Sequence, residues 1–144
     1  MIAIDTNILV YAHRVESDWH DRALATMRSL CDGADLWTIP WPCVHEFFSV
    51  VTNKRIYSPA TTTAEAFAQL REWLDAPSAR LIGESADHLA ALERIVLAGK
   101  LLGPKVHDAR IAAICVSHGV KELWSVDRGF SRMAEIRVRN PLMK

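Results

Sequence analysis

The chain opens on an apolar run that a single carboxylate interrupts. Residues 2–4, Ile-Ala-Ile, show no polar alternation, which is typical of a strand buried on both faces of a parallel sheet. Asp5 follows directly, at the end of the strand where ligand sites of open α/β sheets lie. Residues 6–13 then predict a short helix, which Thr6 or Asn7 can cap. On this stretch alone, the cap explains the polar residues better than a site does.

Strand-like and helix-like patterns alternate along the rest of the chain. Short apolar runs predict strands at residues 36–39, 80–82 and 123–126, and a short edge strand at 136–138. Apolar residues at helical spacing predict helices at residues 18–31 or 20–31, 64–74 and 105–117, around 44–51 and around 89–96.

Polar residues and proline indicate where these helices begin. Asp18 is the expected N-cap of the second helix, Thr62 or Thr63 that of the fourth, and Ser85 that of the fifth. Pro42 suits the first turn of the third helix. The inner faces of the fourth and fifth helices are expected to consist of Phe67, Leu70 and Leu74, and of Leu89, Leu92 and Val96.

The alternation of strands and helices determines the expected architecture. It implies right-handed crossovers between parallel strands. We therefore expect an α/β protein, a three-layer α/β/α sandwich with a central parallel sheet of four to five strands. At 144 residues, the chain is expected to be a single domain over 1–144.

Four acidic residues stand out from their apolar surroundings. Asp5 and Asp127 each follow a buried-strand pattern, Ile-Ala-Ile and Trp-Ser-Val, and neighbouring parallel strands bring such ends together. Glu46 lies within an apolar helix, where a charge is rare without a partner. Asp108 begins a helix of small residues that can pack closely on the sheet. We expect all four at one sheet edge.

Each acid also has a simpler explanation. Asp108 in a first helical turn complements the helix dipole, and Asp127 suits a turn. Glu46 can pair with His45 or lie more exposed than its helix suggests. Taken singly, these explanations weigh at least as much as a site. Four acids directed to one edge favour the site.

Electrostatics indicates what such a site must contain. Carboxylates about 6 Å apart repel by about 3 kcal/mol per pair at an effective dielectric constant of about 20. Over four groups the repulsion, on the order of 15 kcal/mol, rivals the stability of a domain, so protonation or cations must relieve it. An all-oxygen cage suits Mg²⁺ or Mn²⁺ better than zinc. Such ions activate water for phosphodiester hydrolysis, which predicts a nuclease.

Composition adds three limits. The chain has 17 basic and 17 acidic residues, so four acids inside a site leave 17 bases against 13 acids around it. Cys31, Cys43 and Cys115 are widely spaced and odd in number, which favours reduced core thiols. No apolar stretch approaches the roughly 20 residues of a membrane span, and we expect a cytoplasmic protein.

Over nearly its full length, the chain resembles the PIN-domain ribonucleases, specifically the VapC-type toxins of toxin–antitoxin pairs. The resemblance rests on Ile-Asp-Thr-Asn-Ile-Leu-Val-Tyr at 4–11, Glu-Phe at 46–47, Asp-Ala-Arg-Ile-Ala-Ala at 108–113 and Trp-Ser-Val-Asp-Arg-Gly-Phe at 124–130. It implies Mg²⁺- or Mn²⁺-dependent endonucleolytic cleavage of RNA, usually a structured RNA such as a tRNA or a ribosomal RNA loop.

The resemblance also assigns roles to residues. It implies that the catalytic, metal-binding acids are Asp5, Glu46, Asp108 and Asp127. The hydrogen-bonding residues behind them would be Thr6 or Asn7, and Ser125, where the family often has Thr. The candidates for phosphate contacts are Arg128, Lys105, Arg110 and His107, although surface solvation explains each of them equally well.

The partners that the resemblance implies are a second copy of the chain, in a homodimer, and an antitoxin whose C-terminal segment wraps the toxin. Five tryptophans, including Trp41 and Trp73 on or beside helices, fit an aromatic groove for such a segment. They fit core filling equally well.

Two other classes of function compete with this one: a phosphatase or receiver-like α/β domain, and a non-catalytic binding module. A phosphatase of the haloacid-dehalogenase type needs a second Asp two residues after the first, and Thr6 and Asn7 follow Asp5 here. A receiver domain needs paired acids after its first strand, which the chain lacks. A non-catalytic RNA- or protein-binding PIN domain is disfavoured because all four acids are intact.

Overall fold

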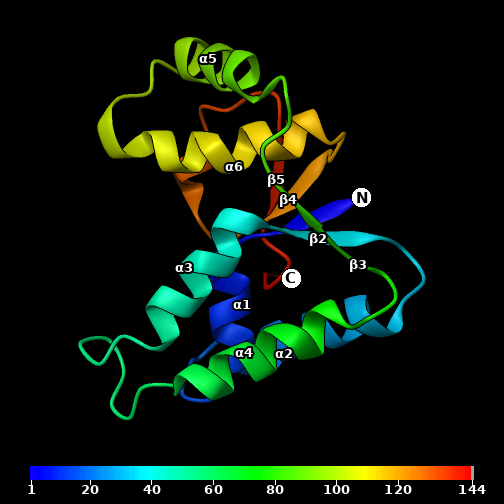
Figure 1. Ribbon diagram of the computed structural model, residues 1–144, viewed down its shortest axis with the longest axis vertical. Coiled ribbons are helices and arrows are strands. Elements are labelled where there is room, and N and C mark those ends of the chain that lie inside the picture. Colours follow the sequence, from blue (N-terminus) through cyan, green and yellow to red (C-terminus); the bar gives the residue numbers. More distant parts are fainter. Residues whose placement is uncertain (144) are drawn as a thin grey trace.

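Five parallel strands form the centre of the protein. The computed structural model describes residues 1–143 (Figure 1). The strands are β1 (Ile2–Ile4), β2 (Trp37–Pro40), β3 (Ala79–Ile82), β4 (Glu122–Trp124) and β5 (Arg137–Arg139). Their order in the sheet is β3-β2-β1-β4-β5, and every neighbouring pair is parallel. Ile4 at the end of β1 lies opposite Trp124 at the end of β4, so the segments that follow both strands leave the same sheet edge.

Helices cover both faces of this sheet. They are α1 (Thr6–His13), α2 (His20–Asp32), α3 (Trp41–Val51), α4 (Thr63–Leu74), α5 (His88–Gly99) and α6 (Val106–Ser117), with 3-10 turns η1 (Gly103–Lys105) and η2 (Arg128–Phe130). In Figure 1, α5 and α6 lie together on one side of the strands, and α1 to α4 lie on the other. The predicted three-layer sandwich is confirmed, with five strands.

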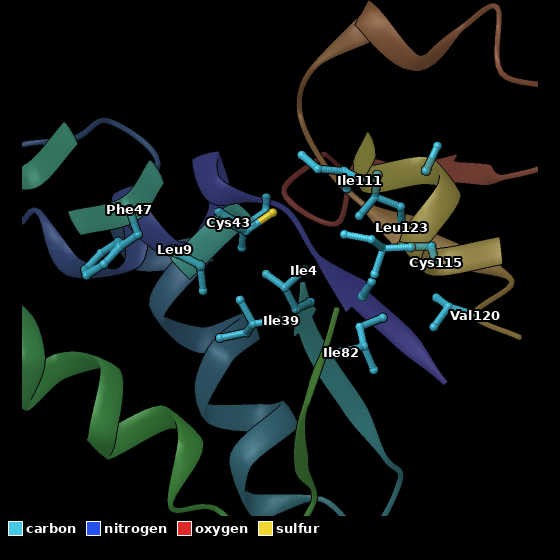
Figure 2. Packing of buried hydrophobic residues seen from close by; sticks show 14 of the residues in the cluster. Ile4, Leu9, Ile39, Cys43, Phe47, Ile82, Ile111, Cys115, Val120 and Leu123 are labelled. Atoms are coloured by element: carbon cyan, nitrogen blue, oxygen red, sulfur yellow. The ribbon is translucent and has the colours of Figure 1, made fainter. Parts of the chain in front are cut away.

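The core lies between the sheet and the two helical layers. Figure 2 shows Leu9, Cys43 and Phe47 on one side of β1, and Ile111 and Cys115 on the other. Removing these side chains from water is the main favourable contribution to folding. The packing of these side chains also holds the start of α3 against the end of β1. This determines the positions of Asp5 and Glu46.

Of the two tryptophans considered for an aromatic groove, Trp73 belongs to the core. It is 4% exposed, and its ring meets that of Phe47 edge-on at a centroid distance of 5.4 Å. Trp41 is 43% exposed at the start of α3. Only Trp41 can therefore contribute to a surface groove.

Three of the predicted helix caps are wrong. Asp5 itself caps α1 by accepting a hydrogen bond from the backbone N–H of Thr6, so neither Thr6 nor Asn7 is the cap. The second helix begins at His20 without a side-chain cap, and Asp18 lies outside it. The fifth begins at His88, because the Ser85 hydroxyl bonds to the Asp87 carboxylate instead of a helix N–H. The Thr62 cap of α4 is confirmed, with Glu65 completing a capping box.

Two inner helix faces are rotated from their predicted positions. On α4 the buried residues are Ala66, Leu70 and Trp73, whereas Phe67 is 50% exposed and packs its ring on Phe48. Leu74 is only partly buried. On α5 the buried residues are Ala91, Ile95 and Gly99, and Leu89 is 78% exposed.

Smaller differences concern the strands and cysteines. The strand predicted at 123–126 is β4, which ends at Trp124, so Asp127 lies in the turn beyond it instead of at its last residue. The predicted edge strand is β5, shifted by one residue. All three cysteines are free thiols, as predicted, and Cys43 and Cys115 are buried. Among residues 1–143, every helix falls short of the length and apolar character that a bilayer span requires.

Candidate functional site

Asp5 is a buried carboxylate at the end of the central strand. It is 5% exposed, and each of its oxygens is held by the protein. Oδ1 accepts hydrogen bonds from the Thr6 backbone N–H at 2.8 Å and from the Cys43 thiol at 3.6 Å. Burial raises the pKa of Cys43 well above its ordinary value, so Cys43 remains a thiol and a donor. The start of α3 therefore supports the Asp5 carboxylate from behind.

Ser125 links Asp5 to the segment that carries Asp127. Its hydroxyl donates to Asp5 Oδ2 at 2.6 Å and accepts from the Asp127 backbone N–H at 3.0 Å. Asn7 completes the link, because its Nδ2 lies 3.2 Å from Ser125 Oγ and its Oδ1 accepts from the Val126 N–H at 3.3 Å. The ends of β1 and β4 are thus tied together by side chains of the first turn of α1 and the turn after β4.

Gly129 brings the carboxylates of Asp108 and Asp127 to one point. A Cβ atom at Gly129 would lie 2.8 Å from Asp108 Oδ2 and 3.1 Å from Asp127 Oδ1. The two carboxylate oxygens are therefore within about 6 Å of one another. The Lys105 ammonium would lie 2.7 Å from the same Cβ, and it forms an ion pair with Asp108 at 3.5 Å. Lys105 thus supplies a positive charge between two negative side chains.

Glu46 lies on α3 at the exposed rim of this group. Burial and then the charge of Asp5 raise its pKa, with smaller contributions from Asp108 and Asp127. The Thr6 hydroxyl lies beside the Glu46 carboxylate but does not reach hydrogen-bond geometry, and it has no partner among residues 1–143 although it is buried. An unpaired buried hydroxyl next to carboxylates is a further oxygen available to a ligand.

Two of the four acids, Asp5 and Glu46, have raised pKa values. Burial raises the pKa of Asp5, and the negative charge of Asp127 adds to this, while hydrogen bonds from Ser125, Thr6 and Cys43 oppose it. Together with the raised pKa of Glu46, this shows that the fold gathers negative charge without neutralising it fully. The predicted convergence of Asp5, Glu46, Asp108 and Asp127 on one sheet edge is found in the structure.

The carboxylates are nevertheless not arranged as a closed metal cage. In the described part of the chain, no three Asp, Glu, His or Cys side chains are grouped closely enough to hold an ion as they stand. Donors of the protein occupy their oxygens instead: Ser125 and Thr6 at Asp5, the Gly129 N–H at Asp127, and Lys105 at Asp108. As metal ligands, these side chains offer negatively charged oxygen atoms. Such ligands fit a hard divalent cation such as Mg²⁺ or Mn²⁺.

The predicted phosphate contacts divide into two groups. Lys105 and Arg128 border the acids, through the ion pair with Asp108 and through the turn that follows Asp127. The Arg110 guanidinium is engaged by Glu84 in an ion pair, so it is not free for a phosphate. His107 is exposed in the first turn of α6.

A cavity of about 480 Å³ opens beside Asp127. Ser125, Asp127 and Asn140 contribute polar atoms to its lining, and Phe130 and Met133 are among its apolar residues. Its volume lies within the roughly 300–1,000 Å³ of small-molecule sites. Asp127 therefore borders a space large enough for part of a substrate.

Sequence reasoning did not identify two residues that shape this site. Cys43 was assigned to the core alone, yet its thiol contacts Asp5. Gly129 stands in the sequence analysis only as part of the motif at 124–130, yet the absence of its side chain admits Asp108, Asp127 and Lys105 to one place. The Asp-Arg-Gly sequence at 127–129 was the one available signal for Gly129.

The protein's family agrees with its parallel α/β sandwich and with the acids at the carboxyl end of the central strands. Residues 2–136 match the model of the PIN domain, and the chain belongs to this family. Over 142 residues it is 30% identical to Ribonuclease VapC43 of Mycobacterium tuberculosis (strain ATCC 25618 / H37Rv), covering 99% of this chain and 96% of that protein. This confirms the class predicted from the motifs, that of the ribonuclease toxins.

Solved structures support the same fold. VapBC2 from Rickettsia felis, bound to a DNA fragment from its promoter, is similar with a TM-score of 0.70 at 19% identity, over 97% of this chain and 98% of that one. Mycobacterium tuberculosis VapC20, described as a sarcin–ricin loop cleaving toxin, is similar with a TM-score of 0.68 at 17% identity, over 97% of this chain and 100% of that one.

Proposed function

We propose that this toxin is a Mg²⁺- or Mn²⁺-dependent endoribonuclease whose metal-holding residues are Asp5, Glu46, Asp108 and Asp127. The observation that carries the proposal is the bridge made by Ser125, whose hydroxyl joins the Asp5 carboxylate to the backbone of Asp127. This bridge spans two strands that are distant in sequence and fixes two acids at one edge. Asp108 and Glu46 approach the same edge from separate helices.

The residues of the chain have separable tasks in this reaction. When bound, the divalent ion supplies activation of water at neutral pH and stabilisation of charge on the phosphate. Ser125 and Asn7 hold the Asp5 carboxylate in one orientation, and Glu46 assists at the rim, directly or through a water molecule. Lys105 and Arg128 bind the phosphate oxygens on either side of the Asp127 turn. The cavity beside Asp127 accommodates a nucleoside next to the cleaved bond.

The proposed substrate class is a structured RNA, such as a tRNA or a ribosomal RNA loop. VapC43, at 30% identity, is named a ribonuclease, and VapC20 is described as cleaving the sarcin–ricin loop. A loop presents unpaired bases whose backbone can enter an open acidic site, unlike the backbone of a regular duplex. Such RNAs are abundant in the cytoplasm, where we place the activity.

The proposed partners are a cognate antitoxin and a second copy of the chain. The similar structure from Rickettsia felis is a VapBC assembly, which supports an antitoxin partner for this chain. Trp41, which is 43% exposed, can take part in such a contact. The homodimer rests on the family resemblance.

The test is cleavage of a purified structured RNA by the purified protein. We expect cleavage with Mn²⁺, its loss in EDTA, and its loss in Asp5→Asn. Asp18→Asn, which removes an exposed acid outside the site, should cleave like the parent protein. If Asp5→Asn cleaves at the parental rate, the activity belongs to another nuclease and the proposal is wrong. If only binding is observed, the chain is a non-catalytic RNA-binding PIN domain.

A further inference from the structure

A second cavity, of about 390 Å³, lies beside the acids and has a strongly basic lining. Its charged residues are Lys100, Lys105, Arg128 and Arg132, and no Asp or Glu contributes to it. The complete chain has equal numbers of basic and acidic residues, so the purely positive charge of this lining differs from the charge balance of the chain. We call these four residues the basic groove.

Most of these positive charges have no internal partner. Within residues 1–143, the side chains of Lys100, Arg128 and Arg132 form no ion pair and no hydrogen bond, and all three residues are exposed. Elsewhere Arg14, Arg94 and Arg110 are each paired with a glutamate. The groove therefore gathers cations that repel one another, and an anionic ligand would relieve that repulsion.

Lys100, one of these cations, has a backbone conformation that is unfavourable for residues other than glycine. Lys100 ends α5 in the left-handed conformation, with φ of 52°, which is a position that glycine usually occupies. Its side chain lines the groove next to Leu101 and Leu102. The connector between α5 and α6 thus directs Lys100 and Lys105 to the same cavity.

The basic groove is continuous with the site of the acids. Lys105 and Gly129 belong to both: Lys105 pairs with Asp108, and a Cβ at Gly129 would touch Lys105, Asp108 and Asp127. Arg128 directly follows Asp127 and also lines the cavity on the other side of the turn. A polyanionic chain with one phosphate at the acids therefore has its next phosphates beside the groove.

We propose that Lys100, Lys105, Arg128 and Arg132 bind the phosphate backbone of the RNA strand on one side of the cleaved bond, because these unpaired cations line a cavity continuous with Asp108 and Asp127. The inference rests on the proposed function, since it takes RNA as the substrate. It adds Lys100 and Arg132, which lie beyond the acids and position the strand without taking part in the reaction. An acidic protein segment is the alternative occupant, and continuity with the cleavage site favours RNA.

The experiment measures binding separately from cleavage. A fluorescent single-stranded RNA oligonucleotide is titrated with the Asp5→Asn protein in EDTA at several salt concentrations, followed by fluorescence anisotropy. Adding Lys100→Gln and Arg132→Gln should weaken binding and lower the slope of log K against log salt by about 1.4, because each phosphate contact to a single strand contributes about 0.7. The control pair Lys54→Gln and Arg71→Gln, exposed cations away from the groove, should leave the slope unchanged.

The outcomes separate this inference from the proposed function. The groove pair is Lys100→Gln with Arg132→Gln. If its salt slope equals that of the control pair, the inferred role of the basic groove is wrong, even if the parent protein cleaves RNA with Mn²⁺. A reduced slope supports the groove even if cleavage is absent. Displacement of the RNA by polyglutamate at equal charge concentration would contradict it, because the surface would then bind any polyanion. In the active protein, the groove pair should raise KM for RNA more than it lowers kcat.

Discussion

The Ser125 hydroxyl lies 2.6 Å from Asp5 Oδ2 and 3.0 Å from the backbone nitrogen of Asp127. Ser125 is 2% exposed, so both contacts are shielded from bulk water. Hydrogen-bond partners of this kind orient a metal-binding carboxylate and fix the direction of its lone pairs. The activity of the proposed site should therefore depend on the Ser125 hydroxyl, which holds the Asp5 carboxylate in one orientation.

Ser125→Ala should lower the cleavage rate by about 10- to 100-fold at limiting Mn²⁺, with partial recovery at high Mn²⁺. The reason is that Asp5 Oδ2 would keep only the longer contact from Asn7, at 3.4 Å. The measurement is the initial rate as a function of metal concentration. Ser125→Thr retains the hydroxyl and should stay closer to the parent. A Ser125→Ala protein with parental metal dependence would contradict this role.

Asp127→Asn should separate stability from activity. Asparagine keeps an oxygen that can accept from the Gly129 N–H, which Asp127 Oδ1 does at 2.7 Å, but it removes the negative charge that helps to raise the pKa of Asp5. We expect the Tm in EDTA to rise by about 1 °C or more and metal-dependent cleavage to fall by about 100-fold or more. Differential scanning fluorimetry and an RNA cleavage assay check the two parts. A lower Tm would mean that Asp127 does not repel Asp5 in the metal-free protein.

The contribution of Asp5 and Glu46 to the stability of the metal-free protein should fall as pH rises through their pKa values. Both pKa values are raised in the folded state above the ordinary values of 3.8 and 4.5, chiefly by burial. A carboxyl group with a raised pKa holds its proton more tightly when folded, so its stabilising effect is complete below the ordinary pKa and disappears above the raised one.

This pH effect is isolated by comparing variants. The free energy of unfolding of Asp5→Asn in EDTA, relative to the parent, should increase from about pH 4 upward and level off once Asp5 is ionised. Asp18→Asn should show no such trend. Urea denaturation at a series of pH values measures it. A difference between Asp5→Asn and the parent that is constant with pH would show that Asp5 titrates normally.

Local pattern was sufficient to predict the strands and the acids. The unbroken Ile-Ala-Ile run identified β1 and put Asp5 at its end, and the same pattern at Trp-Ser-Val led to Asp127. The strand was drawn too long because apolar residues continue to Val126, whereas Ser125 turns its side chain inward to Asp5. This tertiary hydrogen bond lies just beyond the last residue of β4, and no local signal reports it.

Helix faces were harder to predict because two apolar stripes compete on one helix. On α4, Phe67, Leu70 and Leu74 follow a helical spacing, and so do Ala66, Leu70 and Trp73. The structure buries the second set because Trp73 meets Phe47 in the core, while Phe67 packs on Phe48 near the surface. Such a choice depends on the shape of the neighbouring helix α3.

Gly129 should be the residue at which a single methyl group damages the site but not the fold. Its backbone φ does not lie in the left-handed region, so alanine causes no backbone strain there. The new Cβ would instead lie 2.8 Å from Asp108 Oδ2 and 3.1 Å from Asp127 Oδ1, which forces these carboxylates and the flexible Lys105 ammonium to move.

We expect Gly129→Ala to change the free energy of unfolding by less than about 1 kcal/mol and to weaken Mn²⁺ binding about 10-fold or more. Isothermal titration calorimetry with Mn²⁺ measures the binding. Gly119→Ala, at a positive φ of 70° beyond the C-terminal end of α6, serves as the opposite control with strained backbone and unchanged metal affinity. If Gly129→Ala binds Mn²⁺ as the parent does, the oxygens of Asp108 and Asp127 do not act together on one ion, and the proposed four-acid site is wrong in this respect.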